Sequence, residues 1–460
     1  MYLTTKITQT EKHHEVDLNI LARLCYYSAR LYNVGLYSVR QYYFRTNLYL
    51  PYCENYHACK TNENYTILLS DASQQILRLV DRDMRSFFKL LVLKKEGKYS
   101  EAIMIPRYKK PESLSTYILQ GRSCRIQKDG KVAIGLTKKF QELYGIDDKD
   151  IIFTIPKNIR NVTKFKEIRI IPQFGGRQFS IEFIYESNKQ LRKAEGDGYM
   201  SIDIGVNNLA SCAIFSNGNA SQFIVDGRRL KNINYYYNKK AAMLKSKYDK
   251  NKNISSSNTK RMMRLMNGRS NRINDYLNRT VKILVNKCFE NSVTTLVIGY
   301  NKGQKKGINI GKVNNQNMVM IPFYKLRQKL QYQCELHGIT YCPQEESYTS
   351  KASCLDNDYI PTYGETVTTS FSGKRIHRGL YRFSDGSAIN ADINGSVNIL
   401  KKYLKECKSN VAFTTDDVRV LLNAPCERLY AFPKAHKSLA CGQFKSRKQP
   451  VRLWFPQHQD

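Results

Sequence analysis

The sequence predicts an α+β protein of several domains, and three observations support this class. Strand-like and helix-like patterns alternate along the 460 residues, a length that allows two to four domains. The segment LRKAEGDG, residues 191–198, reads as a linker between two differently patterned halves. Asp203 ends a strand-like run and Asp392 opens a helix-like run, which brings acidic side chains to the ends of elements.

The charge of the chain points to a polyanionic partner. Lys and Arg number 74 against 39 Asp and Glu, so the formal net charge is +35. An ordinary metabolic enzyme does not need such an excess, and nucleic acid would neutralise it with release of counterions. Ribosomal and nucleoid-packing proteins share this charge, so charge alone does not indicate an enzyme. The 32 Tyr rings could stack on bases, although most are expected to pack.

Twelve Cys are scattered without a CxxC pair, which argues against a zinc ribbon and against a disulfide framework. We expect lone buried thiols in a reducing cytosol. The N-terminus MYLTTKITQTEKHHE is polar, and no apolar run reaches membrane-spanning length. These features predict a soluble, intracellular protein without a membrane partner.

The first half predicts a helical block inserted in a β block. MYLTTKITQT alternates like a strand, and a helical stripe begins at Ile20. A second helical pattern covers residues 70–97, and Pro106 and Pro111 then interrupt helix. From Tyr117 onward the pattern changes to short strands whose DG and GG pairs suit hairpins.

The second half predicts a sheet with helices. Residues 200–230 read as successive antiparallel strands with a turn at SNGN, and a long basic helical region follows. VTTLVIG then reads as a buried strand, followed by a helix, a strand at ITYCPQEESYTS, and a Gly-rich hairpin region. The run INADINGSVNILKKYLKE closes this half as an amphipathic helix.

This element order is that of an RNase H-like sheet, in which the first strand is central and the last helix starts beside it. Alternation along SIDIGVN points Asp203 away from Ile202 and Ile204. An isolated DxG is more often a strand-end turn, and an Asp in a helix's first turn is favoured by the dipole. Taken together, Asp203 and Asp392 can face one cleft. Clustered acids in a basic protein suit a pair of divalent cations that grip a phosphodiester.

The motifs SIDIGVNNLA and ADINGSVNIL resemble the first and third RuvC motifs of TnpB, the RNA-guided nuclease of insertion-sequence transposons. LYNVGLYSVRQ, PRYKK, VIGYNKG, IPFYKL, ESYTSK and KRIHRGLYR are also similar to TnpB sequences, and the likeness extends over about Tyr32 to Leu404. Type V CRISPR nucleases share this core. The resemblance implies a monomer with a guide RNA, double-stranded target DNA as substrate, and two Mg²⁺ ions as cofactors.

The resemblance also implies a domain plan: an N-terminal β-barrel-like wedge with a helical recognition insert, then a RuvC-like nuclease domain. The expected boundaries are wedge 1–15 and 113–195, recognition 16–112, nuclease 196–348 and 391–406, hairpin insert 349–390, and a tail 407–460.

The second motif departs from the family pattern, because Gly299 stands where a strand-ending Glu is usual. One interpretation is a degraded site in a nuclease-dead, RNA-guided DNA-binding protein. The other is a relocated acid from the next strand, since a cation needs oxygen ligands in space rather than at a fixed sequence position. ESYTSK resembles relatives with such a relocated Glu. We favour Glu346, with Glu345 as its substitute, because alternation lets one of the pair face the cleft.

A second departure lies in the hairpin insert, where TnpB proteins usually carry a four-cysteine zinc ribbon. This chain offers Cys354 and His377, and tetrahedral zinc needs four ligands. Ser353 and Asp356 stand near the expected cysteine positions. We predict a hairpin without zinc, in which Cys354 is a core thiol.

Two groups of residues are candidates for nucleic-acid binding. Basic helical residues could contact phosphates without reading sequence: Arg261, Arg264, Arg269, Arg272 and Arg279. In the N-terminal block, contacts to the duplex beside the target could come from Tyr27, Asn33, Arg40 and Gln41. Helix packing explains Tyr27 equally well.

Two further alternatives are a sugar-kinase or actin-like ATPase, whose fold also opens with IDxG, and a transposase that acts without RNA. The ATPase predicts a second phosphate-binding hairpin and a Gly-rich adenosine loop, and the sequence shows neither. RNA that copurifies with the protein would argue against the transposase that acts without RNA.

Overall fold

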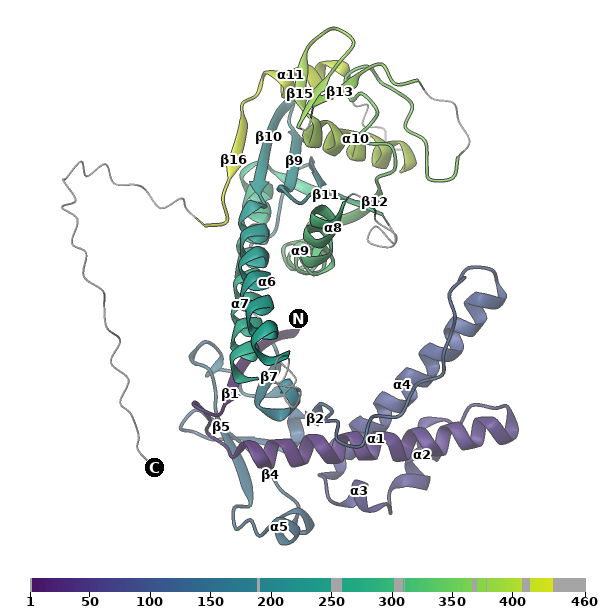
Figure 1. Cartoon of the computed structure of the whole chain (residues 1–460), viewed down its shortest axis with the longest axis vertical. Helices are drawn as coiled ribbons and strands as arrows, with labels where there is room; N and C mark the ends of the chain where they lie inside the picture. The colour runs from purple at the N-terminus through teal and green to yellow at the C-terminus, as the bar shows by residue number, and fades with distance from the viewer. Residues whose placement is uncertain are drawn as a thin grey trace, which may run out of the picture. The chain divides into compact units, whose positions relative to one another are not determined.

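The computed structural model describes residues 2–187, 191–249, 259–301, 309, 311–365, 370–377, 379–407 and 414–432. The chain divides into two compact units, Met1–Gln190 and Leu191–Asp460, and Figure 1 labels their elements. In the described part of the chain, no helix is both long and apolar enough to cross a membrane.

The first unit contains two antiparallel sheets, in the strand orders β1-β7-β6-β2 and β3-β4-β5. The N-terminal strand pairs with β7 along its whole length, from Tyr2 opposite Glu186 to Thr10 opposite Gln178. The strands are β1 (Tyr2–Thr10), β2 (Tyr117–Gln120), β3 (Cys124–Ile126), β4 (Lys131–Gly135), β5 (Asp150–Thr154), β6 (Phe165–Gln173) and β7 (Gln178–Glu186).

Helices interrupt this β block between β1 and β2, as the sequence predicts. They are α1 (Leu18–Thr46), α2 (Tyr52–Cys59), α3 (Glu63–Thr66) and α4 (Ser70–Lys95), with α5 (Lys138–Tyr144) following β4. The long helices α1 and α4 pack together (Figure 1). Gly35 permits the close contact, because a Cβ there would lie 2.6 Å from Leu77 Cδ2.

The second unit has a six-stranded sheet in the order β12-β11-β8-β9-β10-β16. β8, β9 and β10 form an antiparallel meander, and β11 and β12 run parallel to β8. The first strand therefore lies inside the sheet, which confirms the predicted RNase H-like, RuvC-like order. The strands are β8 (Gly198–Asp203), β9 (Asn208–Ser216), β10 (Asn219–Asp226), β11 (Val293–Tyr300), β12 (Thr340–Glu345) and β16 (Cys426–Leu429).

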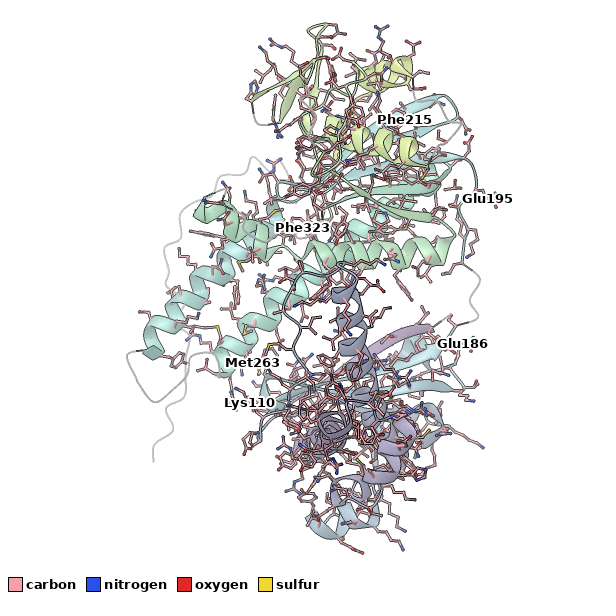
Figure 2. All side chains as sticks on the ribbon, turned by 90° about the vertical axis from the view of Figure 1, so that its right-hand side faces the viewer. Lys110, Glu186, Glu195, Phe215, Met263 and Phe323 are labelled. Carbon is pink, nitrogen blue, oxygen red and sulfur yellow. The ribbon has the colours of Figure 1, made fainter. Side chains whose placement is uncertain are left out.

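Helices cover both faces of this sheet. On β9, Cys212 and Ile214 pack with α7 and α9, whereas Ala213 and Phe215 face the side of α10 and α11. Figure 2 shows Phe215 in this second layer and Phe323 at the start of α9. The helices are α6 (Arg228–Asp249), α7 (Lys260–Glu290), α8 (Lys312–Met320), α9 (Phe323–His337), α10 (Ala391–Glu406) and α11 (Thr415–Asn423).

The segment expected to be a tail contributes to this domain. Helix α11 packs on β10, and β16 extends the sheet by pairing in parallel with β10, from Gln222↔Cys426 to Val225↔Leu429. A four-residue strand with the sequence CERL carries little apolar pattern, so the sequence alone did not predict it. The basic run KSRKQPVR, residues 445–452, lies outside the described residues.

The hairpin insert is a three-stranded sheet of β13 (Lys374–His377), β14 (Leu380–Arg382) and β15 (Ala388–Asn390). Hydrogen bonds to two carboxylates join its loops. Asp356 accepts bonds from the hydroxyls of Ser353, at 2.5 Å, and of Ser384, while Asp358 accepts from Ser353 N at 2.7 Å and from Ser372 Oγ at 2.5 Å.

The two zinc-ligand candidates of this insert lie in different surroundings. Cys354 is fully buried in the hydrophobic cluster around α10, and burial raises the pKa of its thiol to about 12. His377 is exposed on β13. The hairpin without zinc stays a prediction, and the Asp–Ser hydrogen bonds show how its loops are held.

We expect Asp356→Ala to lower the free energy of unfolding by about 1–3 kcal/mol, because it removes the acceptor of Ser353, which is 1% exposed. Thermal unfolding followed by circular dichroism measures this. Asp385→Ala, which affects a local turn with Ser387, is the matched control and should change stability little. Equal, small effects of both substitutions would contradict the assigned role of Asp356.

Candidate functional site

Asp203 is the last residue of β8, the interior strand of the sheet. Its neighbour Ile202 is fully buried in the core facing α7 and α9, so alternation directs Asp203 to the face that α10 covers. Gly395 of α10 makes room for this carboxylate, because a Cβ there would lie 3.0 Å from Asp203 Oδ2. The predicted strand-end aspartate therefore lies directly against the predicted helix.

Small polar residues hold α10 on β8. The hydroxyls of Ser201 and Ser396 lie 2.9 Å apart, and Ser396 Oγ also donates to Ser201 O at 2.9 Å. At the start of the helix, the Asn390 side chain caps the backbone N–H groups of Asp392 and Ile393. The helix therefore begins at a fixed place beside β8, with Asp392 in its first turn.

Gly299 lies at the end of β11, in register with Gln344 of β12. A Cβ on Gly299 would overlap Glu346 Oε2 and lie 2.8 Å from Ile399 Cδ1. The carboxylate of Glu346 thus occupies the space that a side chain at position 299 would need. Asn301 donates a hydrogen bond of 3.2 Å to the other oxygen, Oε1.

The neighbouring Glu345 has different partners. Its carboxylate forms an ion pair with Lys402, whose side chain is 4% exposed, and it accepts a 2.8 Å bond from Ser347 N. Although burial opposes ionisation, the bonds from Lys402 and Ser347 hold the pKa of Glu345 below its usual value. The charge of the Glu345 carboxylate is thus neutralised by Lys402. The Glu346 carboxylate instead lies next to Gly299, at the end of β11.

The three predicted acids interact electrostatically. Burial, followed by the negative charges of Glu346 and Asp392, raises the pKa of Asp203 well above its usual value, while Arg375 opposes this rise. Burial also raises the pKa of Glu346 to about 7, against the nearby charge of Arg327. Carboxylates that resist ionisation together are a typical environment for a divalent cation, which would relieve their repulsion.

This electrostatic strain predicts a pH dependence of stability in metal-free protein. Between pH 4.5 and about 7, folded Glu346 keeps a proton that the unfolded chain has lost. The free energy of unfolding should therefore fall as pH rises through this window. Because a cation needs the ionised form, Mg²⁺ should raise the melting temperature more at about pH 8 than at about pH 5.5.

Melting curves of the wild type and of Glu346→Gln, with EDTA and with Mg²⁺, measure this dependence. The substitution should reduce both the fall of stability with pH and the Mg²⁺ effect. A wild-type melting temperature that rises steadily through the same pH window in EDTA would contradict it.

Asp392 has two polar partners that the sequence did not reveal. Asn208 donates a 2.7 Å bond to Oδ2, and Arg375 of β13 forms an ion pair of 3.1 Å with Oδ1. Arg375 belongs to the KRIHRGLYR stretch that resembles TnpB, which was the available signal. Asn208 lies within the first motif, SIDIGVNNLA, and its partner lies 184 residues away in sequence.

Within the described residues, no group of three or more His, Cys, Asp or Glu side chains stands close enough to hold a metal ion. One of the three predicted acids, Asp392, is paired with Arg375. The donor set itself suits Mg²⁺, which prefers one or two carboxylates and retained waters over an all-protein cage. Binding of Mg²⁺ at Asp392 would compete with the ion pair between Asp392 and Arg375.

A cavity of about 650 Å³ adjoins Asp392. Four cationic side chains line it: Arg228, Lys231, Arg375 and Arg428. Lys231 is oriented by a 2.9 Å bond to Asn207 Oδ1, and Arg228 by an ion pair with Asp226. A cavity with several cations beside a carboxylate has the charge pattern that a phosphodiester requires.

The basic helices α6 and α7 pack side by side in Figure 1 and enclose a groove of about 520 Å³. Arg261, Arg264 and Arg272 are exposed and line this groove with Tyr236 and Tyr237. Their exposure leaves these three side chains accessible to a phosphate backbone.

The other two arginines of this set have intramolecular partners. Arg269 donates to Asn234 Oδ1 at 2.8 Å and to Met320 O at 3.1 Å, and its burial lowers the pKa of the guanidinium. Arg279 pairs with Asp275 and stacks over Phe432. The structure therefore gives Arg269 a packing role.

The N-terminal candidates also contact their own chain. Tyr27 shares a 2.9 Å hydrogen bond with Tyr144, and Asn33 exchanges two bonds with the backbone of Lys109. Arg40 donates to Pro106 O at 3.4 Å and lies over Tyr108. The contact of these residues, and of Gln41, with DNA stays a prediction.

Comparisons with known proteins agree with this fold. Residues 182–305, which include Asp203, match a family described as a probable transposase, and residues 323–399, which include Glu346 and Asp392, match a Cas12f1-like TNB domain. The TnpB-like protein ORF457 of Acidianus two-tailed virus is 25% identical over 429 residues, which are 87% of this chain and 88% of that protein.

A solved structure, the Cas12f1–sgRNA–target DNA complex, has a similar fold. Its protein is 14% identical, and the match covers 83% of this chain and 82% of that chain with a TM-score of 0.53. These matches, the interior position of β8 and the acids at the predicted places favour this family over the ATPase alternative. The chain is thus similar in sequence to a TnpB-like protein and in fold to Cas12f1.

Proposed function

We propose that this chain is an RNA-guided DNA endonuclease whose RuvC-like site uses Asp203, Asp392 and Glu346 with divalent metal. The observation that carries the proposal is the space at Gly299, which the Glu346 carboxylate fills. The side chain that is missing from the usual position is thus matched by an acid entering from the next strand. Simple decay of a site does not require this compensation.

The three carboxylates would hold Mg²⁺, which supplies activation of water and stabilisation of the leaving oxygen. Around it, the chain orients its own groups. Asn208 and the Asn390 cap fix Asp392, Gly395 admits Asp203, and Asn301 holds one oxygen of Glu346. Hydrolysis would leave a 5′-phosphate and a 3′-hydroxyl, and one site would cut both strands in turn.

The cavity beside Asp392 would hold the phosphates of the strand to be cut. Arg228 and Lys231 line it from α6, and Arg375 enters from the hairpin insert. Arg375 could exchange its carboxylate partner for a phosphate when metal and DNA bind. This exchange would free the carboxylate of Asp392 to bind the metal ion when DNA enters the site.

Guide RNA would account for the remaining positive charge. The similar Cas12f1 structure is a complex with sgRNA and target DNA. In this chain, the exposed arginines of the α6–α7 groove would contact phosphates of the RNA–DNA duplex, and base pairing would read the sequence. The protein would read a short flanking motif itself and act as a monomer with its RNA at the nucleoid.

One observation favours an alternative: a nuclease-dead protein that binds DNA through guide RNA. The ion pair between Arg375 and Asp392 occupies an acid that the cutting site needs. In this alternative the pair is permanent, and the chain would act as a repressor.

Cleavage of a target plasmid separates the two proposals. The complex is purified, its copurifying RNA is sequenced, and plasmids with the matching target and varied flanks are incubated with Mg²⁺. We expect linear product from the wild type and none from Asp203→Ala, which should still bind the target in gel-shift assays. Binding without cleavage by the wild type would establish the alternative, and absence of specific RNA would refute both.

A further inference from the structure

The cationic cavity beside Asp392 includes one residue from an unexpected part of the chain. Arg428 lies on β16, the four-residue strand that extends the sheet, opposite Ile224 of β10. Its Nη1 donates to Asn208 Oδ1 at 3.1 Å and to Asp226 Oδ1 at 3.2 Å. Its side chain is 32% exposed, so most of it lies within the protein.

Asp226 anchors this arginine. The aspartate ends β10, is 4% exposed, and also accepts bonds from Arg228 N at 3.0 Å and Arg228 Nε at 2.7 Å. Burying a carboxylate is costly unless charged and backbone donors satisfy it, which favours keeping Arg428 and Arg228 bonded to Asp226. The guanidinium of Arg428 is therefore fixed relative to the sheet.

The side chain of Asn208 links Arg428 to Asp392. A guanidinium can only donate hydrogen bonds, and an ionised carboxylate can only accept them. The amide of Asn208 stands between the two, with its oxygen facing Arg428 and its nitrogen 2.7 Å from Asp392 Oδ2. Arg428 thus determines which end of the amide faces the carboxylate. Without Arg428, the amide of Asn208 could rotate and turn its oxygen toward Asp392. The amide oxygen and the carboxylate would then repel each other.

We propose that Arg428 is a positioning residue of the nuclease site and acts on Asp392 through Asn208. This inference rests on the proposed function of Asp392 as a metal ligand. In this proposal the segment after Cys407 contributes to the site, because β16 places the guanidinium of Arg428 beside the side-chain oxygen of Asn208. It also divides the cavity's cations by role, since Arg428 has two protein acceptors while Lys231 donates to the side-chain oxygen of Asn207.

The test compares Arg428→Gln, Arg428→Lys and a matched control, Glu427→Gln. Glu427 is the preceding residue of the same strand, its carboxylate is 55% exposed, and it pairs with Lys287 at the surface. Three quantities are measured for each variant: the cleavage rate as a function of Mg²⁺, the affinity of Mn²⁺ for the DNA-free complex by calorimetry, and the melting temperature.

We expect Arg428→Gln to cleave about 10- to 100-fold more slowly and to bind Mn²⁺ more weakly, which is the usual effect of losing an outer partner of a metal ligand. Arg428→Lys should recover part of both, because one cationic donor remains. Glu427→Gln should match the wild type. Combining Arg428→Gln with Asn208→Ala should add little to the larger single effect, since both act on one path.

The outcomes separate this inference from the proposed function. Wild-type cleavage with unchanged rate and Mn²⁺ affinity in Arg428→Gln would overturn the inference and leave the function intact. An inactive wild type whose Mn²⁺ binding is still weakened by Arg428→Gln would overturn the function and support the positioning role. A lower melting temperature with no rescue by Lys and unchanged Mn²⁺ affinity would show that Arg428 only stabilises the sheet.

Discussion

Gly299→Ala is expected to abolish DNA cleavage although it removes no polar group. The added methyl would overlap the Glu346 carboxylate and approach Ile399 Cδ1 to 2.8 Å. Ile399 belongs to the buried face of α10, so it has little room to move, and Glu346 would be displaced instead. We expect a loss above about 100-fold, more than the loss of an outer partner causes, because a ligand itself is moved.

A plasmid-cleavage time course with Mg²⁺ measures this effect, and gel shifts check that target binding persists. Gly268→Ala is the matched control, since nothing lies within 4 Å of a Cβ at that position of α7. Equal cleavage by Gly299→Ala and wild type would mean that the Glu346 carboxylate is not needed beside Gly299.

The second large effect concerns the adjacent glutamates. Glu346→Gln should reduce cleavage by more than about 100-fold, because the amide keeps the shape of the side chain but is a poor ligand for a hard cation. Glu345→Gln should leave cleavage nearly unchanged, because its carboxylate already pairs with Lys402.

The pair also differs in its effect on stability. Glu345→Gln leaves the ammonium of Lys402, 4% exposed, without its counterion, so it should destabilise the fold; breaking a fully buried pair costs about 3–5 kcal/mol. Partial exposure of Glu345, at 35%, reduces this expectation. Urea unfolding measures it alongside cleavage rates taken well below the transition. Loss of cleavage in Glu345→Gln with full cleavage in Glu346→Gln would show that Glu345, not Glu346, is the acid that cleavage needs.

The sequence predicted the architecture well where local patterns carry it. The meander from β8 to β10, the helices around it and the interior position of Asp203 follow from periodicity and order. Local spacing also placed Asp392 in the first turn of α10. These features depend on neighbours in sequence, so a single chain contains the information.

Other parts of the site depend on contacts between distant segments. The choice of Glu346 over Glu345 needed strand alternation and the resemblance, while the space at Gly299 became visible only in the packed sheet. Arg375 and Asn208 contact Asp392, and Arg428 contacts Asn208, from three different elements. β16 was missed because CERL, as a short edge strand, has almost no pattern of its own.

The proposed relocation of the acid has a simple structural basis. β11 and β12 are adjacent and parallel, so their ends reach the same edge of the sheet. A carboxylate just beyond β12 can enter the space above β11 when position 299 carries no side chain. Under the proposed function, loss of one side chain and gain of another would preserve the site without changing the order of the sheet.

The most direct measurement of the central claim is anomalous diffraction from crystals of the protein soaked in Mn²⁺. The account predicts Mn²⁺ bound by carboxylate oxygens of Asp203, Asp392 and Glu346, with Glu345 still paired to Lys402. Mn²⁺ that contacts Asp203 and Asp392 while Glu346 points elsewhere, or no Mn²⁺ near these acids at all, would contradict it.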